Sequence, residues 1–164
     1  CKVIGIAGGP EKCAYVKDVL EFDECIDYKG GNLKQDLEDV CPNGIDIYFE
    51  NVGGEVTRAI APLLNKGSRV PICGFISKYN EGDMLTVETP FHVLGALKDK
   101  PEHRFFVVTE WINEWEDATK EILDLVSKDK MRYRETITKG FENAPQALRD
   151  VLTGKNFGKQ IIEI

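Results

Sequence analysis

The chain has 164 residues, of which 42% are apolar and 30% charged, and its formal net charge is −7. These values are typical of a soluble globular protein with one well-formed core. The negative charge argues against binding to nucleic acid or to an anionic membrane, because phosphate groups are recognised by clustered Lys and Arg. No apolar run approaches the roughly 18 residues that a membrane span requires. We therefore expect no nucleic-acid partner and no membrane partner.

The cysteines are odd in number and lack CxxC spacing, which predicts reduced thiols in an intracellular, cytoplasmic protein. They are Cys1, Cys13, Cys25, Cys41 and Cys73. Only His92 and His103 could join them as metal ligands, and no spacing favours such a site. The sequence therefore predicts no zinc.

The opening stretch CKVIGIAGGPEK contains an apolar run from Val3 to Ala7 that breaks at Gly8 and Gly9 and restarts at Pro10. This pattern predicts a strand, a tight turn and a helix, because proline suits the first helical position. Glycines let a phosphate approach the backbone, and the charge of Lys12 suits the 2′-phosphate of NADP. From these residues alone, the alternative is a solvated lysine in an ordinary strand–turn–helix unit.

Strand and helix patterns alternate along the rest of the chain. Predicted strands cover residues 3–7, 25–28, 45–51, 69–74, 105–109 and 160–164, and residues 133–141 are also expected to be extended. Predicted helices cover residues 10–22, 33–40, 56 to about 66, 91–100, 111–125 and 143–152. This alternation is typical of an α/β protein with a mostly parallel sheet.

Two of the predicted strands carry finer signals. In the strand at 45–51, Ile45, Ile47 and Phe49 alternate with Asp46, Tyr48 and Glu50. A period of two residues is the pattern of a strand. In the strand at 69–74, Pro71 lacks a backbone donor, so this strand is expected at an edge of the sheet.

The helices carry cap and packing signals. Asn32 with Gln35 resembles a capping box, and Asn143 with Gln146 is expected to cap the last helix, which Gly154 closes. A stripe of apolar residues at helical spacing is expected to belong to the core rather than to a ligand site. The stripe consists of Trp111, Trp115, Ala118, Ile122 and Leu125.

We expect two parts, residues 1–130 and 131–164, with a charged hinge from Asp129 to Glu135. The loop from Phe75 to Pro90 is long enough to be functional or mobile. Cys1 leads directly into a strand, and no Gly-rich phosphate loop follows in the place where a dinucleotide fold would carry it. We therefore expect the chain to be the later part of a longer polypeptide.

Five motifs in this order resemble the zinc-independent branch of the medium-chain dehydrogenase/reductase superfamily, with its leukotriene/prostaglandin, alkenal double-bond and curcumin reductases. The motifs are VIGIAGGPEK (3–12), IDYK (26–29), IDIYFENVGGE (45–55), PICGFISKYN (71–80), and GFENAPQAL with GKNFGK (140–148, 154–159). The resemblance implies an NADP(H)-binding Rossmann-like domain with a doubly wound parallel sheet. The first strand and its Gly-rich loop are absent, and the C-terminal tail resembles part of the GroES-like substrate domain.

The missing first strand has a structural consequence. A sheet without a central member leaves its neighbours with unpaired edges, so the isolated chain is expected to be poorly stable and inactive.

The resemblance assigns the adenosine end of the cofactor to Lys12 and Tyr28, a cation and a phenol that hold the 2′-phosphate, beside the turn of Gly8 and Gly9. Asn51 matches an asparagine that faces the cofactor from a strand end. By itself, Tyr28 would be interpreted as a half-buried strand-end residue and Asn51 as a turn residue.

The nicotinamide end is assigned by the same resemblance to Cys73, Gly74, Phe106, Val108 and, from the C-terminal tail, Asn156. A buried small thiol is usually a packing group, so Cys73 is expected to be a contact and not a catalyst. Without the resemblance, Phe106 and Val108 would be interpreted as core residues and Asn156 as a turn residue.

Tyr79 matches the active-site tyrosine of double-bond reductases. The implied reaction is hydride transfer from NADPH to the β-carbon of an α,β-unsaturated aldehyde or ketone, with a phenol O–H stabilising the developing enolate. The implied assembly is a homodimer formed through edge strands, for which Phe105 to Thr109 is the candidate. The alternatives are a non-catalytic NADP-binding module and an unrelated doubly wound protein such as a methyltransferase.

Overall fold

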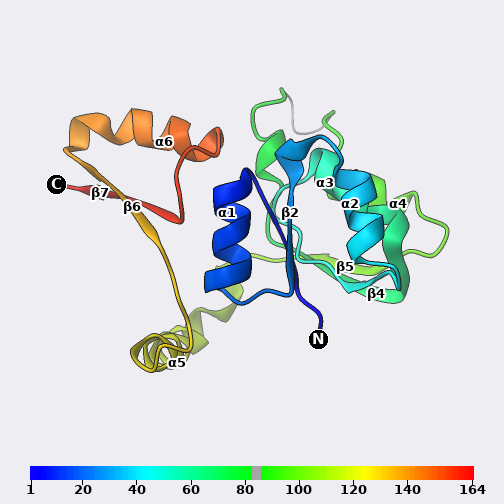
Figure 1. The fold of residues 1–164 in the computed structure, drawn as a ribbon, viewed down its shortest axis with the longest axis horizontal. Coiled ribbons are helices and arrows are strands. Elements are labelled where there is room, and N and C mark those ends of the chain that lie inside the picture. The colour runs from blue at the N-terminus through cyan, green and yellow to red at the C-terminus, as the bar shows by residue number, and fades with distance from the viewer. Residues whose placement is uncertain (83–85) are drawn as a thin grey trace. The chain divides into compact units, whose positions relative to one another are not determined.

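The computed structural model describes residues 1–82 and 86–164, and its contacts divide the chain into two units (Figure 1). The first unit comprises Cys1–Cys25 with Trp111–Ile164, and the second comprises Ile26–Glu110. The boundary expected between residues 130 and 131 stays a prediction. The loop expected from Phe75 to Pro90 includes residues 83–85, which lie outside the described part of the chain.

Strands and helices alternate as expected, and the strands form three sheets. β1 (Ile4–Ala7) pairs with β2 (Glu24–Asp27), β3 (Ile45–Ile47) with β4 (Leu64–Ile72) and β5 (Glu102–Phe105), and β6 (Glu135–Lys139) with β7 (Lys159–Glu163). The β3–β4–β5 and β6–β7 pairings are parallel. The α/β class with parallel sheets is therefore confirmed. Among the described residues, the strands up to β5 form two separate sheets, β1–β2 and β3–β4–β5.

The core of the second unit is built from its central strand and three helices, α2 (Leu33–Val40), α3 (Gly54–Ile60) and α4 (Pro90–Gly95). Ile72 of β4 and Leu94 of α4 are fully buried, and Leu37 of α2 and Ile60 of α3 are nearly so. Burial of such a side chain contributes about 1.5–3 kcal/mol relative to exposure. This packing holds the carboxyl ends of β3 and β4 in place.

The position of β4 corrects the expectation that Pro71 places its strand at an edge. β4 is the central strand, and Pro71 pairs with Arg104 of β5. The Pro71 carbonyl accepts a hydrogen bond from the Glu50 N–H at 3.0 Å. β3 ends at Ile47 and resumes only as a bridge between Glu50 and Ile72. The N–H group that Pro71 lacks is therefore missing where the pairing of β3 is itself interrupted. For this reason the proline does not prevent β4 from being the central strand.

Some boundaries differ from the expected ones. α3 ends at Ile60 and a 3-10 turn at 61–63 follows, because Pro62 cannot donate to the preceding helical turn. β4 consequently begins at Leu64, inside the range predicted as helix. β5 ends at Phe105, where the predicted strand begins, and Val108–Glu114 forms two 3-10 turns with a kink at Trp111 between them.

The first unit opens with β1 and α1 (Pro10–Ala14), which continues as a π-helical turn at Tyr15–Val19. Glu21 has φ 60°, outside the right-handed helical region, so the helix ends before the predicted Phe22. Later in this unit, α6 (Ala144–Leu152) connects the parallel strands β6 and β7 (Figure 1). Gly154 closes α6 as expected, with φ 67°.

Neither predicted asparagine cap forms. Asn32 and Asn143 make no side-chain cap bond, and Asn143 donates to the carbonyl four residues earlier. Gln35 and Gln146 each donate to an aspartate four residues further along their helices. The side chains therefore find local partners within or before the helix rather than at its open N–H groups.

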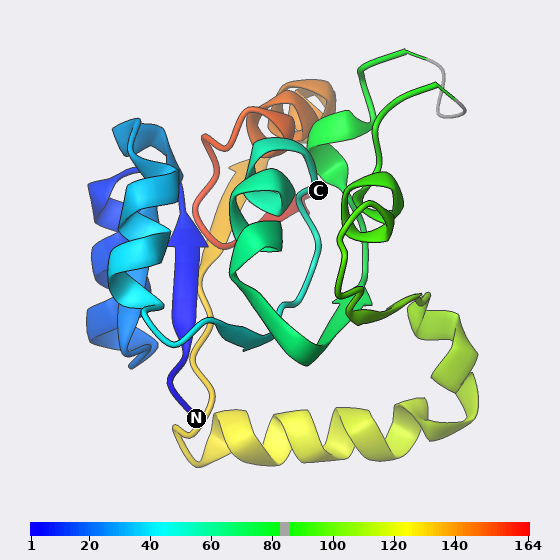
Figure 2. The ribbon, with the colours of Figure 1, turned by 90° about the vertical axis from the view of Figure 1, so that its right-hand side faces the viewer.

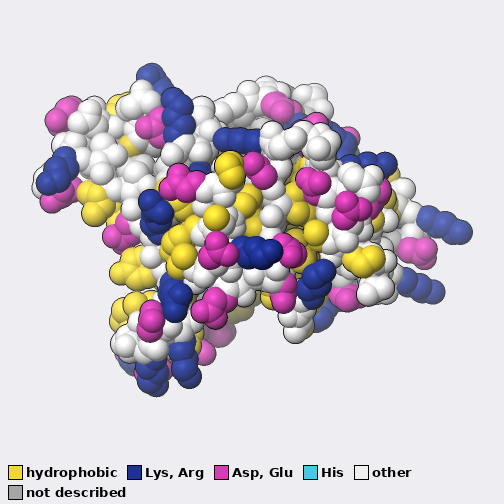
Figure 3. Space-filling model, viewed as in Figure 1, with side chains coloured by type: hydrophobic (Ala, Val, Ile, Leu, Met, Phe, Trp, Pro, Cys, Tyr) yellow, Lys and Arg dark blue, Asp and Glu magenta, His cyan; other side chains and the backbone are white. Residues whose placement is uncertain are grey.

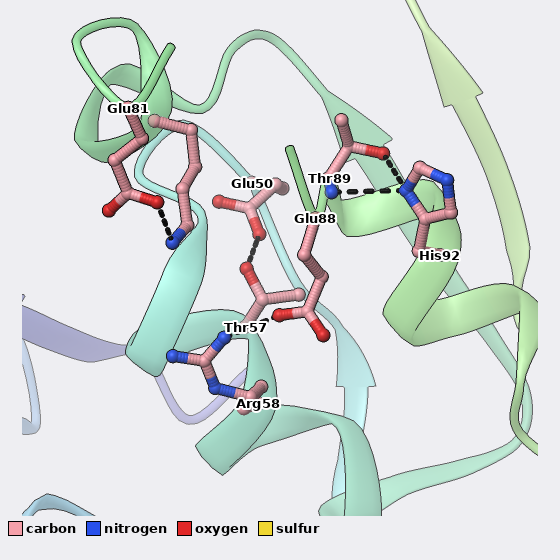
Figure 4. Close-up of polar contacts among 8 residues, drawn as sticks. Glu50, Thr57, Arg58, Glu81, Glu88, Thr89 and His92 are labelled. Carbon is pink, nitrogen blue, oxygen red and sulfur yellow. Dashed lines mark hydrogen bonds and ion pairs between the residues drawn. The ribbon is translucent and has the colours of Figure 1, made fainter. Parts of the chain in front are cut away.

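α4 has the capping box that the sequence analysis did not identify. The Thr89 N–H donates to His92 Nδ1 at 3.1 Å, and the Thr89 hydroxyl lies 2.8 Å from the same nitrogen (Figure 4). The helix ends at Gly95, before the predicted Lys100.

α5 (Trp115–Ser127) is a straight helix (Figure 2), and its apolar stripe is exposed. Trp115, Ile122 and Leu123 are 49%, 47% and 62% exposed, and no residue of α5 is buried. The expectation that the stripe from Trp111 to Leu125 belongs to the core is therefore wrong. Helical periodicity predicts an apolar face but not what covers it. Figure 3 shows apolar side chains at the surface near α5 and β6.

Candidate functional site

The carboxyl ends of β3 and β4 meet at one edge of the second unit. The Glu50 carbonyl accepts hydrogen bonds from the N–H groups of Cys73 at 2.8 Å and Gly74 at 3.3 Å. The next turn is tied in the same way, since Ile76 N–H donates to the Asn51 carbonyl at 3.3 Å. Ligands of open α/β sheets bind beyond the carboxyl ends of strands. This edge is therefore the candidate site.

In residues 47–50, which lead to the site, the polar side chains are buried and the apolar side chains are exposed. Tyr48 and Glu50 are buried, at 9% and 0% exposure, whereas Ile47 and Phe49 are 55% and 57% exposed. The alternation is confirmed for residues 47–50, where Tyr48 and Glu50 face the core, whereas Asp46 is exposed and Ile45 is half-buried. A buried carboxylate is costly unless its oxygens are hydrogen-bonded, so the partners of Glu50 decide this register.

Glu50 is bound by three donors. Its Oε1 accepts the N–H groups of Val52 and Gly53, both at 2.8 Å, and its Oε2 accepts the hydroxyl of Thr57 on α3 (Figure 4). Burial, and then the nearby Glu50 carboxylate, raise the pKa of the Tyr48 phenol well above its ordinary value. Tyr48, Glu50 and Thr57 therefore form one buried polar group directly behind the site.

Three of the predicted site residues come together around Gly74. A Cβ atom on Gly74 would lie 2.9 Å from Tyr79 Oη and 3.0 Å from Asn51 Oδ1. Both distances are shorter than ordinary van der Waals contact, so a side chain at Gly74 would displace the Tyr79 hydroxyl or the Asn51 amide. The Phe75 N–H donates to Tyr79 Oη at 3.4 Å, and the two rings meet edge to face at 5.6 Å. The Tyr79 side chain is 50% exposed, so a ligand can reach it.

Lys78 anchors the turn that carries Tyr79. Lys78 is only 8% exposed, and its Nζ lies 2.6 Å from Glu81 Oε2 (Figure 4). Its side chain passes Gly54, where an added Cβ would lie 3.2 Å from Lys78 Cε. The Ser77 N–H also donates to the Val52 carbonyl at 2.9 Å. These contacts fix the Tyr79 turn against the loop after β3.

The remaining predicted residues of this end are partly exposed. Cys73 is exposed, which corrects the expectation of a buried thiol, because it follows the last core position of β4. Phe106 continues the β4 pairing through its N–H to the Ile72 carbonyl at 3.1 Å, and its ring meets Phe49 edge to face. Val108 is 55% exposed, so it is not a core residue.

Tyr28 stands at the end of β2, 44% exposed, and lines a hollow of about 520 Å³ between the first turns of α2 and α3. The Lys29 Nζ lies 5.8 Å from its ring centroid. Lys34 and Glu55 also line the hollow. Tyr28 belongs to the second unit and Lys12 to the first, so their pairing stays a prediction.

The first unit brings Lys12 together with the C-terminal turn that contains Asn156. Lys12 Nζ donates to the Gly154 carbonyl at 2.6 Å, and Asn156 Nδ2 donates to the Gly158 carbonyl. Gly9, ahead of α1, has φ 100° and open space where a Cβ would lie. Gly8 lies in the same turn.

The same turn is held by aromatic and cationic contacts. The rings of Tyr15 and Phe157 meet edge to face at 5.2 Å, and the Arg134 guanidinium lies 3.7 Å from the Phe157 centroid. A cation over an aromatic face contributes about 0.5–2 kcal/mol. α1 and the 154–158 turn therefore share one packed contact.

The structure thus groups Asn51, Cys73, Gly74 and Tyr79 at one strand edge. The sequence analysis did not single out Glu50 and Thr57, which organise that edge. The available signal was an acidic residue inside an apolar run, directly before Asn-Val-Gly-Gly.

Within residues 1–82 and 86–164, no group of three or more His, Cys, Asp or Glu side chains could hold a metal ion. In the same part of the chain, no helix has the length and apolar character needed to cross a membrane. The five cysteines are free thiols.

Parallel strands with glycine turns and polar residues at their carboxyl ends are the arrangement of doubly wound nucleotide-binding proteins. The chain belongs to the zinc-binding dehydrogenase family, whose sequence model matches residues 20–162.

Two curated relatives are similar over nearly the whole chain. The NADPH-dependent curcumin reductase of Escherichia coli (strain K12) is 41% identical over 100% of this chain and 48% of its own length. Prostaglandin reductase 1 of Sus scrofa is 40% identical over 99% of this chain and 49% of its own length. The chain therefore spans about half the length of the curated relatives it matches.

Solved structures agree with this family. The crystal structure of CurA from Vibrio vulnificus in complex with NADPH is 43% identical, with a TM-score of 0.89 over 99% of this chain and 49% of that one. A quinone oxidoreductase of Pseudomonas syringae pv. Tomato DC3000, 18% identical, has a TM-score of 0.78 over 99% of this chain and 49% of that one, and shows the shared fold alone.

Proposed function

We propose that the chain is the cofactor-binding part of an NADPH-dependent oxidoreductase that reduces the carbon–carbon double bond of α,β-unsaturated aldehydes or ketones. The observation that carries the proposal is the group of Asn51, Gly74 and Tyr79 at adjoining strand ends. The names of the similar proteins, an NADPH-dependent curcumin reductase and a prostaglandin reductase, support the same class.

The residues present fit NADP(H). Gly9 has no side chain and open space in front of its Cα, so a phosphate can approach the turn after β1. Lys12 would supply a cation to the 2′-phosphate, with Tyr28 as the phenol donor. Gly8 belongs to the same proposed adenosine end.

At the nicotinamide end, the proposed contacts are the residues that border or follow the strand ends. They are Asn51, Cys73, Gly74, Phe106 and Val108, with Asn156 from the C-terminal turn. Gly74 keeps Asn51 and Tyr79 close to each other without filling the space between them. Tyr79 and the proposed contacts leave the reaction to the cofactor and to this chain's own residues.

Tyr79 is the proposed catalytic residue. When bound, NADPH supplies a hydride for the β-carbon of the substrate, and negative charge then develops on the carbonyl oxygen. The Tyr79 oxygen accepts the Phe75 N–H, so its own O–H can donate to that oxygen. The phenol stabilises the enolate and can relay the proton that the α-carbon requires.

The proposal includes a cytoplasmic location and a homodimer. The free cysteines support the location. β5 is the last strand in the order β3–β4–β5, so within the described residues its outer edge is available for pairing with a second copy. Phe105 and Val107 beside it are 45% and 47% exposed.

A fluorescence titration with NADPH and NADH, on the parent chain and on Lys12→Ala, tests the cofactor assignment. We expect NADPH to bind more tightly than NADH, and Lys12→Ala to lose at least tenfold of that preference, because the 2′-phosphate loses its cation. Lys155→Ala, a nearby exposed lysine, is the matched control and should keep the preference.

The outcomes separate the alternatives. Absence of binding by either nucleotide would contradict the proposal that this chain holds the cofactor. NADPH binding, with no enone-dependent NADPH oxidation by the protein to which the chain belongs, would favour the non-catalytic module.

A further inference from the structure

Glu50 is the most buried acidic group in the described part of the chain, and the proposed reaction does not use it. Its side chain is 0% exposed, although it lies one residue before the proposed cofactor contact Asn51. Its two carboxylate oxygens hold the Val52 and Gly53 N–H groups and the Thr57 hydroxyl. A carboxylate buried at such a cost is expected to have a defined task.

The first contact of Glu50 sets the shape of the loop after β3. Gly53 has φ 79° and Gly54 has φ 62°, which are conformations that only glycine adopts without strain. The two N–H groups bound by Oε1 lie in this loop, so both point inward to the carboxylate. Without an acceptor at this position, two loop N–H groups would lose their partner.

The second contact of Glu50 joins the loop to the Tyr79 turn. The Glu50 carbonyl accepts the N–H groups of Cys73 and Gly74, and the Val52 carbonyl accepts that of Ser77. The side chain therefore fixes the loop, and the backbone of the same residue fixes the end of β4. Figure 4 shows the carboxylate and Thr57 between the β3 loop and α3.

We propose that Glu50 is a positioning residue that sets the Asn51 amide and the Tyr79 turn for cofactor and substrate through its bonds to the 52–53 loop. The proposal rests on the proposed function, because it assumes that Asn51 contacts the cofactor. Thr57 holds the opposite oxygen and supports the carboxylate without touching the loop amides. Because the loop amides bind Oε1 and Thr57 binds Oε2, a Thr57 variant serves as the control for a Glu50 variant.

Three variants separate positioning from stability. Glu50→Leu has a similar volume and no acceptor, so we expect NADPH affinity to fall at least tenfold. Glu50→Gln keeps one oxygen for the two loop amides, so affinity should stay within threefold. Thr57→Val removes the hydroxyl but leaves the loop bonds, so it should lower the melting temperature and keep NADPH affinity within threefold.

Two readouts are required, and one of them needs no cofactor. Hydrogen exchange of the Val52 and Gly53 amides in the unliganded chain should accelerate at least tenfold in Glu50→Leu, and stay near the parent rate in Glu50→Gln and Thr57→Val. A double-mutant cycle with Asn51→Ala should show strong non-additivity in NADPH affinity, because Glu50 acts through Asn51.

The proposal is overturned if the parent chain binds NADPH and Glu50→Leu binds it equally well, or if its effect adds to that of Asn51→Ala. If the parent chain binds no NADPH, it is instead the proposed function that fails. Should Glu50→Leu not fold, Glu50→Asp replaces it. Its shorter side chain reaches the amides less well, and an unchanged affinity and exchange rate would again overturn the proposal.

Discussion

At the scale of single residues, the site depends on the absence of one side chain. Gly74 stands between Asn51 and Tyr79, and even a methyl group would meet both oxygens at about 3 Å. The phenol is held near the strand end by the Phe75 N–H and by the edge of the Phe75 ring. A substitution can therefore test the Tyr79 hydroxyl separately from the rest of the site.

Replacing Tyr79 by Phe removes only that hydroxyl. We expect turnover to fall at least tenfold while NADPH affinity stays nearly unchanged, because the lost donor acts on charge that develops during the reaction. Enone-dependent NADPH oxidation gives kcat, and fluorescence titration gives affinity. Tyr28→Phe is the crossed control and should weaken NADPH binding with a smaller effect on kcat. Unaltered turnover would remove Tyr79 from the mechanism.

At the scale of elements, β3 shows that hydrophobic alternation does not fix which face is buried. Tyr48 and Glu50, which follow β3, face the core because Thr57 and two loop N–H groups satisfy Glu50, and Tyr48 joins the same polar group. The exposed Phe49 is partly covered by Phe106. Satisfied hydrogen bonds here outweigh the preference for burying an apolar strand face.

The buried Tyr48 predicts a loss of stability at alkaline pH. Its folded pKa is raised, so above pH 10 the unfolded chain releases a proton that the folded chain retains, and the free energy of unfolding falls. One such proton amounts to about 1.4 kcal/mol at pH 11. This loss should be absent in Tyr48→Phe, although this variant is less stable at pH 7.

Urea unfolding at pH 7 and pH 11 measures the effect. Thr57→Val is the control, because it weakens the same polar group but keeps the phenol, and it should retain the alkaline loss. Equal alkaline losses in the parent and in Tyr48→Phe would contradict the assignment.

At the scale of the whole molecule, the described residues include many exposed apolar side chains. Their strands form three separate sheets, and α5 has no buried residue. The chain also spans about half the length of the relatives it matches. That the isolated chain is poorly stable and inactive stays a prediction.

The outer edge of β5 predicts how two copies associate. Val107→Asp places a charge beside this edge, and in a two-fold dimer each new charge would lie near its copy. We expect this variant to sediment as a monomer under conditions in which the parent is a dimer. Lys100→Asp, an exposed change before β5, is the control and should stay dimeric. A monomeric parent at high concentration would contradict the homodimer proposal.

The sequence by itself determined the α/β class, the order of strands and helices, and the motifs that carry the resemblance. These features follow from local periodicity, glycine and proline chemistry, and residues close together in the chain. It also placed Asn51, Gly74 and Tyr79 in motifs that adjoin strand ends. Element boundaries were less well determined, as at Pro62 and Glu21, where backbone conformation ended the helices early.

Only the tertiary structure decided which face of β3 is buried, that β4 is central despite Pro71, and that the stripe on α5 is exposed. Each depends on contacts outside the local sequence pattern: Thr57 on the next helix for Glu50, β5 for β4, and for α5 the lack of any buried residue in the described structure. The local sequence pattern shows only which residues are polar and which are apolar. Whether its burial is favourable is decided by the hydrogen bonds and contacts that the complete fold supplies.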